Sequence, residues 1–200
     1  SGILTVSTGD LRVTTAGTNT ASVVTVGGTQ TLTAKTLTSP AITTATFSGA
    51  QILAEGASIQ LDPVLSADGT YSGVTETGTA GAALAFGDLI YLDPTDSRWE
   101  LADANAAAAA DGDSRGNLGI CVLAAAGDGS ATVILRYGNV RADTAFPAMT
   151  INAQMFVSET AGDITGTVPT TSGVVMRAIG FAKTADELFF APSTDYATHT

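Results

Sequence analysis

The first fifty residues place the tightest constraint on the fold, and the stretch "GGTQTLTAKTLTSPAI" at 27–42 shows why. These fifty residues contain fifteen threonines and three charged residues, and their apolar side chains come singly or in pairs between glycines. Threonine and valine favour strands, and the stretch at 27–42 carries no apolar stripe of helical spacing. The pattern therefore predicts short β-strands and argues against an amphipathic helix.

The apolar side chains of this region are too sparse to build a core within one chain. Leu32, Leu37 and Ile42 recur every five residues. Thin strands with unpaired edges are unstable alone, so we expect several copies to wrap around a common axis. We favour a homotrimer, with Leu32, Leu37 and Ile42 as candidate trimer contacts. A disordered threonine-rich linker is the alternative.

The chain changes character at about residue 80. Fuller strand patterns follow, such as "DLIYLD", "ATVILRYG" and "ELFFAP", and acidic residues gather in the turns between them. The sequence thus predicts an all-β protein in three parts. Residues 1–50 form an extended oligomerisation or anchoring region, residues 51–80 a turn-rich connector, and residues 81–200 a compact β domain.

The C-terminal part also contains an internal repeat. The segment 87–100 matches 152–165, and the segment 118–135 matches 178–192, each as a strand, an acidic turn and a returning strand. Two related β units of this kind can close into a small barrel or a sandwich. We therefore expect an internally duplicated barrel or sandwich.

The net charge of −11 excludes several kinds of partner. Only Lys35 and Lys183 are lysines, and no basic cluster is present. Tight nucleic-acid binding depends on basic side chains that neutralise phosphates, so we expect no nucleic-acid partner. No apolar run reaches the length of a membrane span, so we expect a soluble chain without membrane insertion.

The sequence offers little to catalysis or metal binding. Cys121 lies in the apolar run "GICVL" and is expected to be a buried, inert thiol, and His199 a frayed terminal residue. The segment 111–116, "DGDSRG", begins like a calcium loop. However, Arg115 and Val122 occupy ligand positions, so we interpret it as a solvated turn. We expect no metal and no cofactor.

Neither paired carboxylates nor nucleotide-binding glycine motifs indicate an enzyme. Most of the nineteen acids lie beside Gly, Pro, Ser or Thr, where they form turns. Four aromatic residues could form a sugar-stacking platform, because aromatic faces suit the apolar side of a sugar ring: Trp99, Tyr91, Tyr137 and Tyr196, of which Trp99 and Tyr91 are the candidate ligand contacts. Core packing is the alternative for all four. The polar neighbours of Trp99 predict a partly exposed strand.

Two stretches resemble structural proteins of bacteriophages. "TQTLTAKTLTSP" resembles a "TQTLTNKTLTSP" segment found in phage fibre and other virion-surface proteins, with Ala34 in place of Asn. The segments "GDLIYLDPTDSRWELADA", "VRADTAFPAMTI" and "TADELFFAPSTDYATHT" resemble the C-terminal β module of fibre-like phage proteins. The "LDPTDSRWELADA…LGICVLAAA" portion is also similar to small trimeric decoration proteins of phage heads.

These resemblances imply a non-enzymatic structural protein on the virion surface. The first hypothesis is a trimeric tail or head fibre that projects its C-terminal β domain. Its partners would be its own copies, capsid or tail proteins, and host glycans or proteins as candidate contacts. The alternative is a capsid decoration protein, whose N-terminal segment clamps neighbouring capsid subunits.

Overall fold

The computed structural model describes residues 46–48, 50, 52–105 and 114–200. The regular elements of this part of the chain are β-strands, which confirms the expected all-β fold there. None of the described residues forms a helix that could span a membrane. The strands are β1 (Thr70–Thr79), β2 (Leu89–Leu92), β3 (Trp99–Leu101), β4 (Leu118–Leu123), β5 (Ala131–Arg141), β6 (Gln154–Val157), β7 (Ile164–Thr165), β8 (Val175–Met176), β9 (Ala178–Ala182), β10 (Glu187–Phe190) and β11 (Ala197–Thr198).

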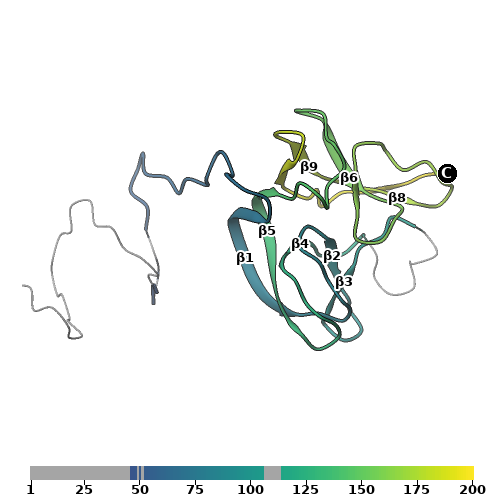
Figure 1. The fold of residues 1–200 in the computed structure, drawn as a ribbon, viewed down its shortest axis with the longest axis horizontal. Coiled ribbons are helices and arrows are strands. Elements are labelled where there is room, and N and C mark those ends of the chain that lie inside the picture. The colour runs from purple at the N-terminus through teal and green to yellow at the C-terminus, as the bar shows by residue number, and fades with distance from the viewer. Residues whose placement is uncertain (1–45, 49, 51, 106–113) are drawn as a thin grey trace, which may run out of the picture. The chain divides into compact units, whose positions relative to one another are not determined.

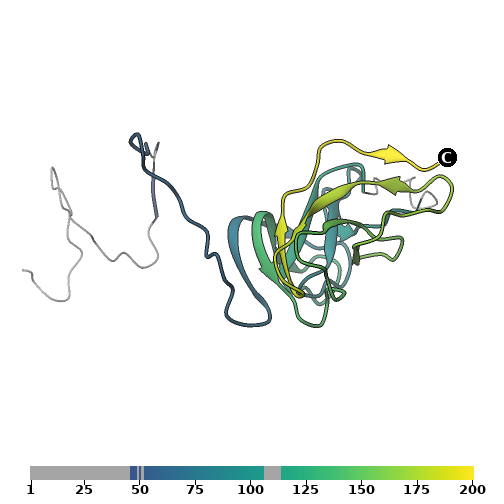
Figure 2. The ribbon, with the colours of Figure 1, turned by 90° about the horizontal axis from the view of Figure 1, so that it is seen from above.

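Nine of these strands form one antiparallel sheet that curls into a half-barrel (Figure 1). Its strand order is β3-β2-β4-β5-β10-β9-β6-β7, and β1 pairs with β5 outside this path. The remaining strands, β8 and β11, form a separate two-stranded sheet near the C-terminus (Figure 2).

The long strand β5 holds the two halves of the sheet together. Its residues 133–135 pair with β4, its residues 138–141 pair with β10, and β1 pairs with it along nearly its whole length. A strand has only two hydrogen-bonding edges. It follows that β4 and β10 share one edge of β5, while β1 occupies the other.

The outer edge of β1 is free within the described part of the chain. It pairs with no further strand, apart from a bridge between Ala80, just after β1, and Trp99. The ten residues of β1 lie inside the stretch 51–80 that was expected to be a connector. By its internal contacts the chain divides between Ile52 and Leu53, so β1 belongs to the compact unit 53–200.

The two halves of the sheet have the same connectivity. In the first half β2 pairs with both β3 and β4, and β4 pairs with β5. In the second half β6 pairs with both β7 and β9, and β9 pairs with β10. The β5–β10 pair joins the halves. The matching segments of the sequence therefore occupy matching places in the sheet.

Apolar residues are buried on both faces of the first half. Neighbouring residues of a strand point to opposite faces, and Ile134 and Leu135 belong to different clusters. The larger cluster joins residues from both halves, among them Leu89, Leu118, Met155, Ile179, Leu188 and Phe190. The smaller cluster belongs to the first half and contains Ala80, Leu84, Ile90, Trp99, Cys121, Ala125 and Ile134.

Phe190 occupies the bend of the sheet. This fully buried ring lies between two glycines, since Gly138 is its partner on β5 and Gly180 its partner on β9. Both glycines have positive φ angles, 142° and 152°, which other residues rarely adopt. A Cβ atom on Gly180 would lie 2.0 Å from the carbonyl oxygen of Phe189. The two glycines thus allow the strands to approach and curl around the ring.

Candidate functional site

Trp99 is a core residue. The residue is 3 % exposed and belongs to the smaller cluster, whereas Glu100 and Leu101 are partly exposed, so β3 is the partly exposed strand that was expected but Trp99 itself is buried. The polar residues around it in the sequence point elsewhere: Arg98 pairs with Asp96 and Asp128. In the single chain the indole ring offers no open face for stacking a sugar.

Tyr91 is buried as well, in the larger cluster, so the core-packing alternative describes Trp99 and Tyr91, whereas Tyr137 and Tyr196 are exposed. The candidate trimer contacts Leu32, Leu37 and Ile42 lie outside the described residues. The start of the calcium-like loop, residues 111–113, lies outside them too.

Cys121 is fully buried, as predicted. Its Sγ atom lies 3.3 Å from the carbonyl oxygen of Leu123 and 3.6 Å from the hydroxyl of Thr132. Burial raises the pKa of the Cys121 thiol, which keeps it protonated at neutral pH. The environment therefore disfavours the thiolate that a nucleophile requires.

His199 is anchored, so the expectation of a frayed terminal residue is wrong. Its backbone N–H donates to Val174 O, and its carbonyl oxygen accepts from Gly173 N–H at 2.7 Å. It directly follows β11, which pairs with β8. Strand pairing thus holds the last residues in place. Among the described residues, no group of three or more His, Cys, Asp or Glu could hold a metal ion.

Arg177 fixes the return of the chain after the undescribed residues 106–113. Its Nη1 atom donates to the carbonyl oxygens of Ser114 and Gly116, both at 2.6 Å, and its Nε atom donates to Ser193 O at 2.7 Å. The guanidinium is buried and bonds backbone carbonyls. It therefore has a structural role, which sequence reasoning did not identify.

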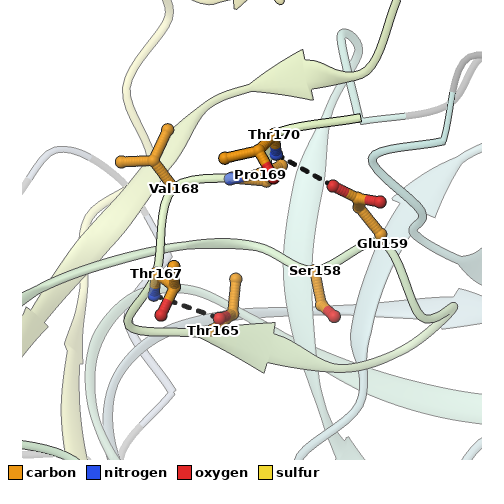
Figure 3. A pocket seen from close by; sticks show the side chains of 7 residues that line it. All are labelled: Ser158, Glu159, Thr165, Thr167, Val168, Pro169 and Thr170. Atoms are coloured by element: carbon orange, nitrogen blue, oxygen red, sulfur yellow. Dashed lines mark hydrogen bonds between the residues drawn. The ribbon is translucent and has the colours of Figure 1, made fainter. Parts of the chain in front are cut away.

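A small pocket of about 220 Å³ lies beside the β6–β7 hairpin (Figure 3). Its lining is rich in hydroxyls and consists of Ser158, Glu159, Thr165, Thr167, Val168, Pro169 and Thr170. In Figure 3 the carboxylate of Glu159 points toward Thr170, and the N–H of Thr167 toward the hydroxyl of Thr165. The polar groups of the pocket thus bond one another.

Glu159 holds the loop that closes this pocket. Its carboxylate accepts from the hydroxyl of Thr171 at 2.5 Å and from the N–H groups of Thr170 and Thr171 at 3.0 and 3.2 Å. These bonds, above all that from the Thr171 hydroxyl, keep the pKa of Glu159 below its ordinary value. The lowered pKa keeps the carboxylate ionised at neutral pH, and its three hydrogen bonds hold the loop in place.

An uncovered aromatic surface lies on the opposite side of the sheet from the larger cluster. Asn139, Phe189 and Phe181 are successive partners across β5, β10 and β9. The ring of Tyr137 meets that of Phe189 edge-on, with centroids 5.1 Å apart, and Val74 is the partner of Tyr137 on β1. We call Val74, Tyr137, Phe189 and Phe181 the aromatic face.

The aromatic face borders an open hollow of about 660 Å³. Its lining combines residues of the sheet with two chain segments and consists of Leu61, Pro63, Asn139, Ile151, Asn152, Phe181, Ala182, Lys183 and Phe189. Hydrogen bonds fix one segment, because Asn139 donates to Asp62 O and Lys183 donates to Pro63 O, both at 2.7 Å. The hollow is about three times as large as the pocket beside the β6–β7 hairpin.

The sequence contained a signal for this surface. In "ELFFAP" the adjacent Phe189 and Phe190 must point to opposite faces of a strand, so one ring lies outside the core if the other lies inside. Partnering Phe181 with Phe189 requires the strand register, which sequence reasoning did not supply.

Comparisons of the chain with known protein families, curated proteins and solved structures found no match.

Proposed function

We propose that this chain is a non-enzymatic structural protein of a bacteriophage virion, a trimeric tail or head fibre. Its N-terminal region would assemble three copies, and each copy would present a compact β unit at the particle surface. The resemblance of "TQTLTAKTLTSP" to a segment of phage fibre proteins supports this origin. Capsid or tail proteins would be its partners on the particle.

The observation that carries the proposal is the continuation of the five-residue repeat. After Leu32, Leu37 and Ile42 it runs on through Phe47 and Ile52. In the single chain Phe47 is 65 % exposed and Ile52 is 91 % exposed. Apolar side chains that stay exposed to water do not gain the stabilisation that burial would supply. Neighbouring copies of the chain would bury them.

The odd spacing of the repeat supports more than one neighbour. Successive side chains of a strand alternate between its two faces, so residues five apart point to opposite sides of a flat strand. Burying both Phe47 and Ile52 then requires apolar surface on both sides. Two further copies around a three-fold axis would provide it.

The segment that follows the repeat also exposes apolar side chains, which supports contact with other copies of the chain. Leu53 and Ile59 are exposed, and so is Val64, six residues before β1. The structure describes all residues of the stretch 53–60. Within this stretch it shows one hydrogen bond between backbone groups, from Ala57 N–H to Ala54 O. A segment with exposed apolar side chains and few backbone bonds of its own is suited to contact with other chains.

We also infer that the compact unit arose by duplication. The repeat in the sequence pairs 87–100 with 152–165 and 118–135 with 178–192. The shared connectivity of the two halves of the sheet supports this origin, since β2, β3 and β4 correspond to β6, β7 and β9.

A capsid decoration protein is the second candidate. It is favoured by the free edge of β1, because an unpaired edge can accept a strand from a neighbouring protein. In that case the compact unit would bind the capsid, whereas in a fibre it would project from the particle.

The proposal is tested by comparing the full chain with its Ile52→Asp variant. We expect the wild type to be a trimer of about 60 kDa, three times the 20.0 kDa of one chain, and the variant to dissociate. Val168→Asp is the matched control, since it places the same charge at an exposed apolar residue far along the chain. Light scattering gives the masses, and an unchanged trimer in Ile52→Asp contradicts the proposed role of the repeat.

Electron microscopy of the wild-type chain then separates the two candidates. A fibre predicts an elongated particle that is broader at one end. A decoration protein predicts a compact particle without a shaft.

A further inference from the structure

We propose that the aromatic face is an interface between copies of this chain, buried around the three-fold axis of the trimer. The inference rests on the proposed trimer and adds to it the surface of the compact unit that takes part.

The aromatic face has the composition of an interior surface but lies in water in the single chain. Phe181 and Tyr137 are each 47 % exposed, and Val74 is exposed further still, as is Ile151, which lines the hollow. On the other side of the same strands Val140, Leu188 and Ala182 are buried. The sheet therefore has one buried face and one uncovered apolar face, and contiguous uncovered apolar surface marks interaction sites.

Asn139 lies at the border of the hollow and is only partly satisfied in its hydrogen bonds. The residue is 5 % exposed and lines the hollow, and its Nδ2 atom donates to Asp62 O. Its Oδ1 atom is buried and has no hydrogen-bond donor among the described residues. Leaving a buried acceptor unpaired costs about 1–3 kcal/mol, so this border of the hollow is a weak point of the single chain.

The charge distribution favours a second copy as the occupant. Two chains of net charge −11 repel each other wherever acidic surfaces meet. The residues that line the hollow include one charged side chain, Lys183, whose ammonium bonds Glu187 at 2.5 Å and Pro63 O. No carboxylate belongs to this lining, so copies can meet here without strong repulsion between acids.

The hollow beside the aromatic face lies close in the sequence to the segment that is proposed to hold the three copies together. Leu61 and Pro63 line the hollow, and they directly follow the exposed segment that contains Ile59. If the residues before Leu53 hold three chains together, the short connection gives the three compact units a high effective concentration. The surface nearest to that connection is then the one best placed to face the axis.

Engineered cysteines test this arrangement in the full chain. Phe181→Cys places a thiol on the aromatic face, and Tyr196→Cys is the matched control, because Tyr196 is an aromatic residue of almost equal exposure, 48 %, outside the face. Cys121 is fully buried and contributes little background. The readouts are the rate of maleimide labelling and the formation of covalent dimers under mild oxidation, with the mass of each variant measured alongside.

We expect the thiol of the Phe181→Cys trimer to label about tenfold more slowly than that of the Tyr196→Cys trimer. The Phe181→Cys variant should also form covalent dimers that the Tyr196→Cys variant does not form. Adding Ile52→Asp to the Phe181→Cys chain should remove this protection together with the trimer. Protection that persists in the dissociated chain overturns the inference, because the single chain then covers the site itself.

Two other outcomes separate the proposed interface from the proposed trimer. A trimer in which the two engineered thiols label at the same rate overturns the interface but leaves the proposed trimer standing. The face would then be open to another ligand, such as a host glycan. A chain that is monomeric before any substitution contradicts both proposals.

Discussion

The guanidinium of Arg136 lies over the indole ring of Trp99, with 5.2 Å between its central carbon and the ring centroid. The same guanidinium donates to Leu118 O at 2.7 Å and to Asn117 Oδ1 at 3.0 Å. Strands β5, β4 and β3 are therefore linked through one side chain. This arrangement makes Trp99 part of the scaffold, although its residue type had suggested a ligand contact.

Replacing Trp99 with alanine should destabilise the compact unit by about 3–5 kcal/mol, the usual cost of removing a large buried aromatic. Trp99→Phe should cost less, because it keeps much of the buried area. Urea unfolding followed by circular dichroism measures both. A loss below about 1 kcal/mol in Trp99→Ala would show that the ring is not a core element.

Gly78 should not tolerate a side chain. A Cβ atom there would lie 2.6 Å from two atoms of the Trp99 ring and 2.9 Å from Cδ1 of Ile134. We expect Gly78→Ala to cost about 1–3 kcal/mol through overpacking. Gly127→Ala is the control, because nothing lies within 4 Å of its Cβ position. Equal stabilities of the two variants would contradict the packing described for β1.

Deletions should locate the start of the compact unit before β1. Removing residues 1–52 should leave a folded β unit, whereas removing residues 1–79 deletes β1 and exposes a long edge of β5. We expect the shorter product to aggregate or to unfold without cooperativity. Thermal unfolding distinguishes them, and a cooperative transition in residues 80–200 would show that β1 is dispensable.

Asp88 should make the protein less stable as the pH rises. Burial, with a smaller contribution from the charge of Asp163, raises the pKa of Asp88, while a bond from Ala85 N–H opposes the shift. Between the ordinary pKa and the raised one, the folded state binds more protons than the unfolded state, so stability falls with increasing pH. Asp88→Asn should be more stable above this window, by less than about 1 kcal/mol, and the gain should vanish below it.

Glu159 should show the opposite dependence. Hydrogen bonds from Thr171 and Thr170 lower the pKa of Glu159, so its contribution is present above the ordinary pKa and is lost as the pH falls through the lowered value. We expect Glu159→Gln to reduce stability at neutral pH and to match the wild type in strong acid. Melting temperatures from strongly acidic to neutral pH test both carboxylates. If the stability of both variants relative to the wild type changed with pH in the same direction, the environments assigned to Asp88 and Glu159 would be contradicted.

The sequence was sufficient to predict the strands that carry dense apolar runs. "GICVL" and "ATVILRYG" correspond to β4 and β5, and the paired segments of the repeat fall in matching places of the sheet. Runs of β-branched and apolar residues between turn formers depend on local chemistry alone, which is why they could be recognised. The strand β1 was missed because "TYSGVTETGT" is polar and contains two glycines, and its pairing with β5 is a long-range property.

The candidate site was harder to predict because exposure depends on tertiary packing. Trp99 has polar neighbours in the sequence, yet the curl of the sheet brings Gly78 and Arg136 against its ring. Phe181 lies in the apolar strand "AIGFA", and the register that pairs it with Phe189 places it on the exposed face. The surroundings of Trp99 come from strands that lie 21 and 37 residues away in the chain, whereas Phe181 and Phe189 belong to neighbouring strands whose register the sequence pattern did not supply.

The native mass of the full chain in solution tests the central claim most directly. Light scattering over a range of concentrations should give about 60 kDa, three times the 20.0 kDa of one chain, and the mass should fall only on strong dilution, where the trimer dissociates. A mass of 20.0 kDa at every concentration would contradict the trimer, and the repeat that runs from Leu32 to Ile52 would then need partners other than copies of this chain.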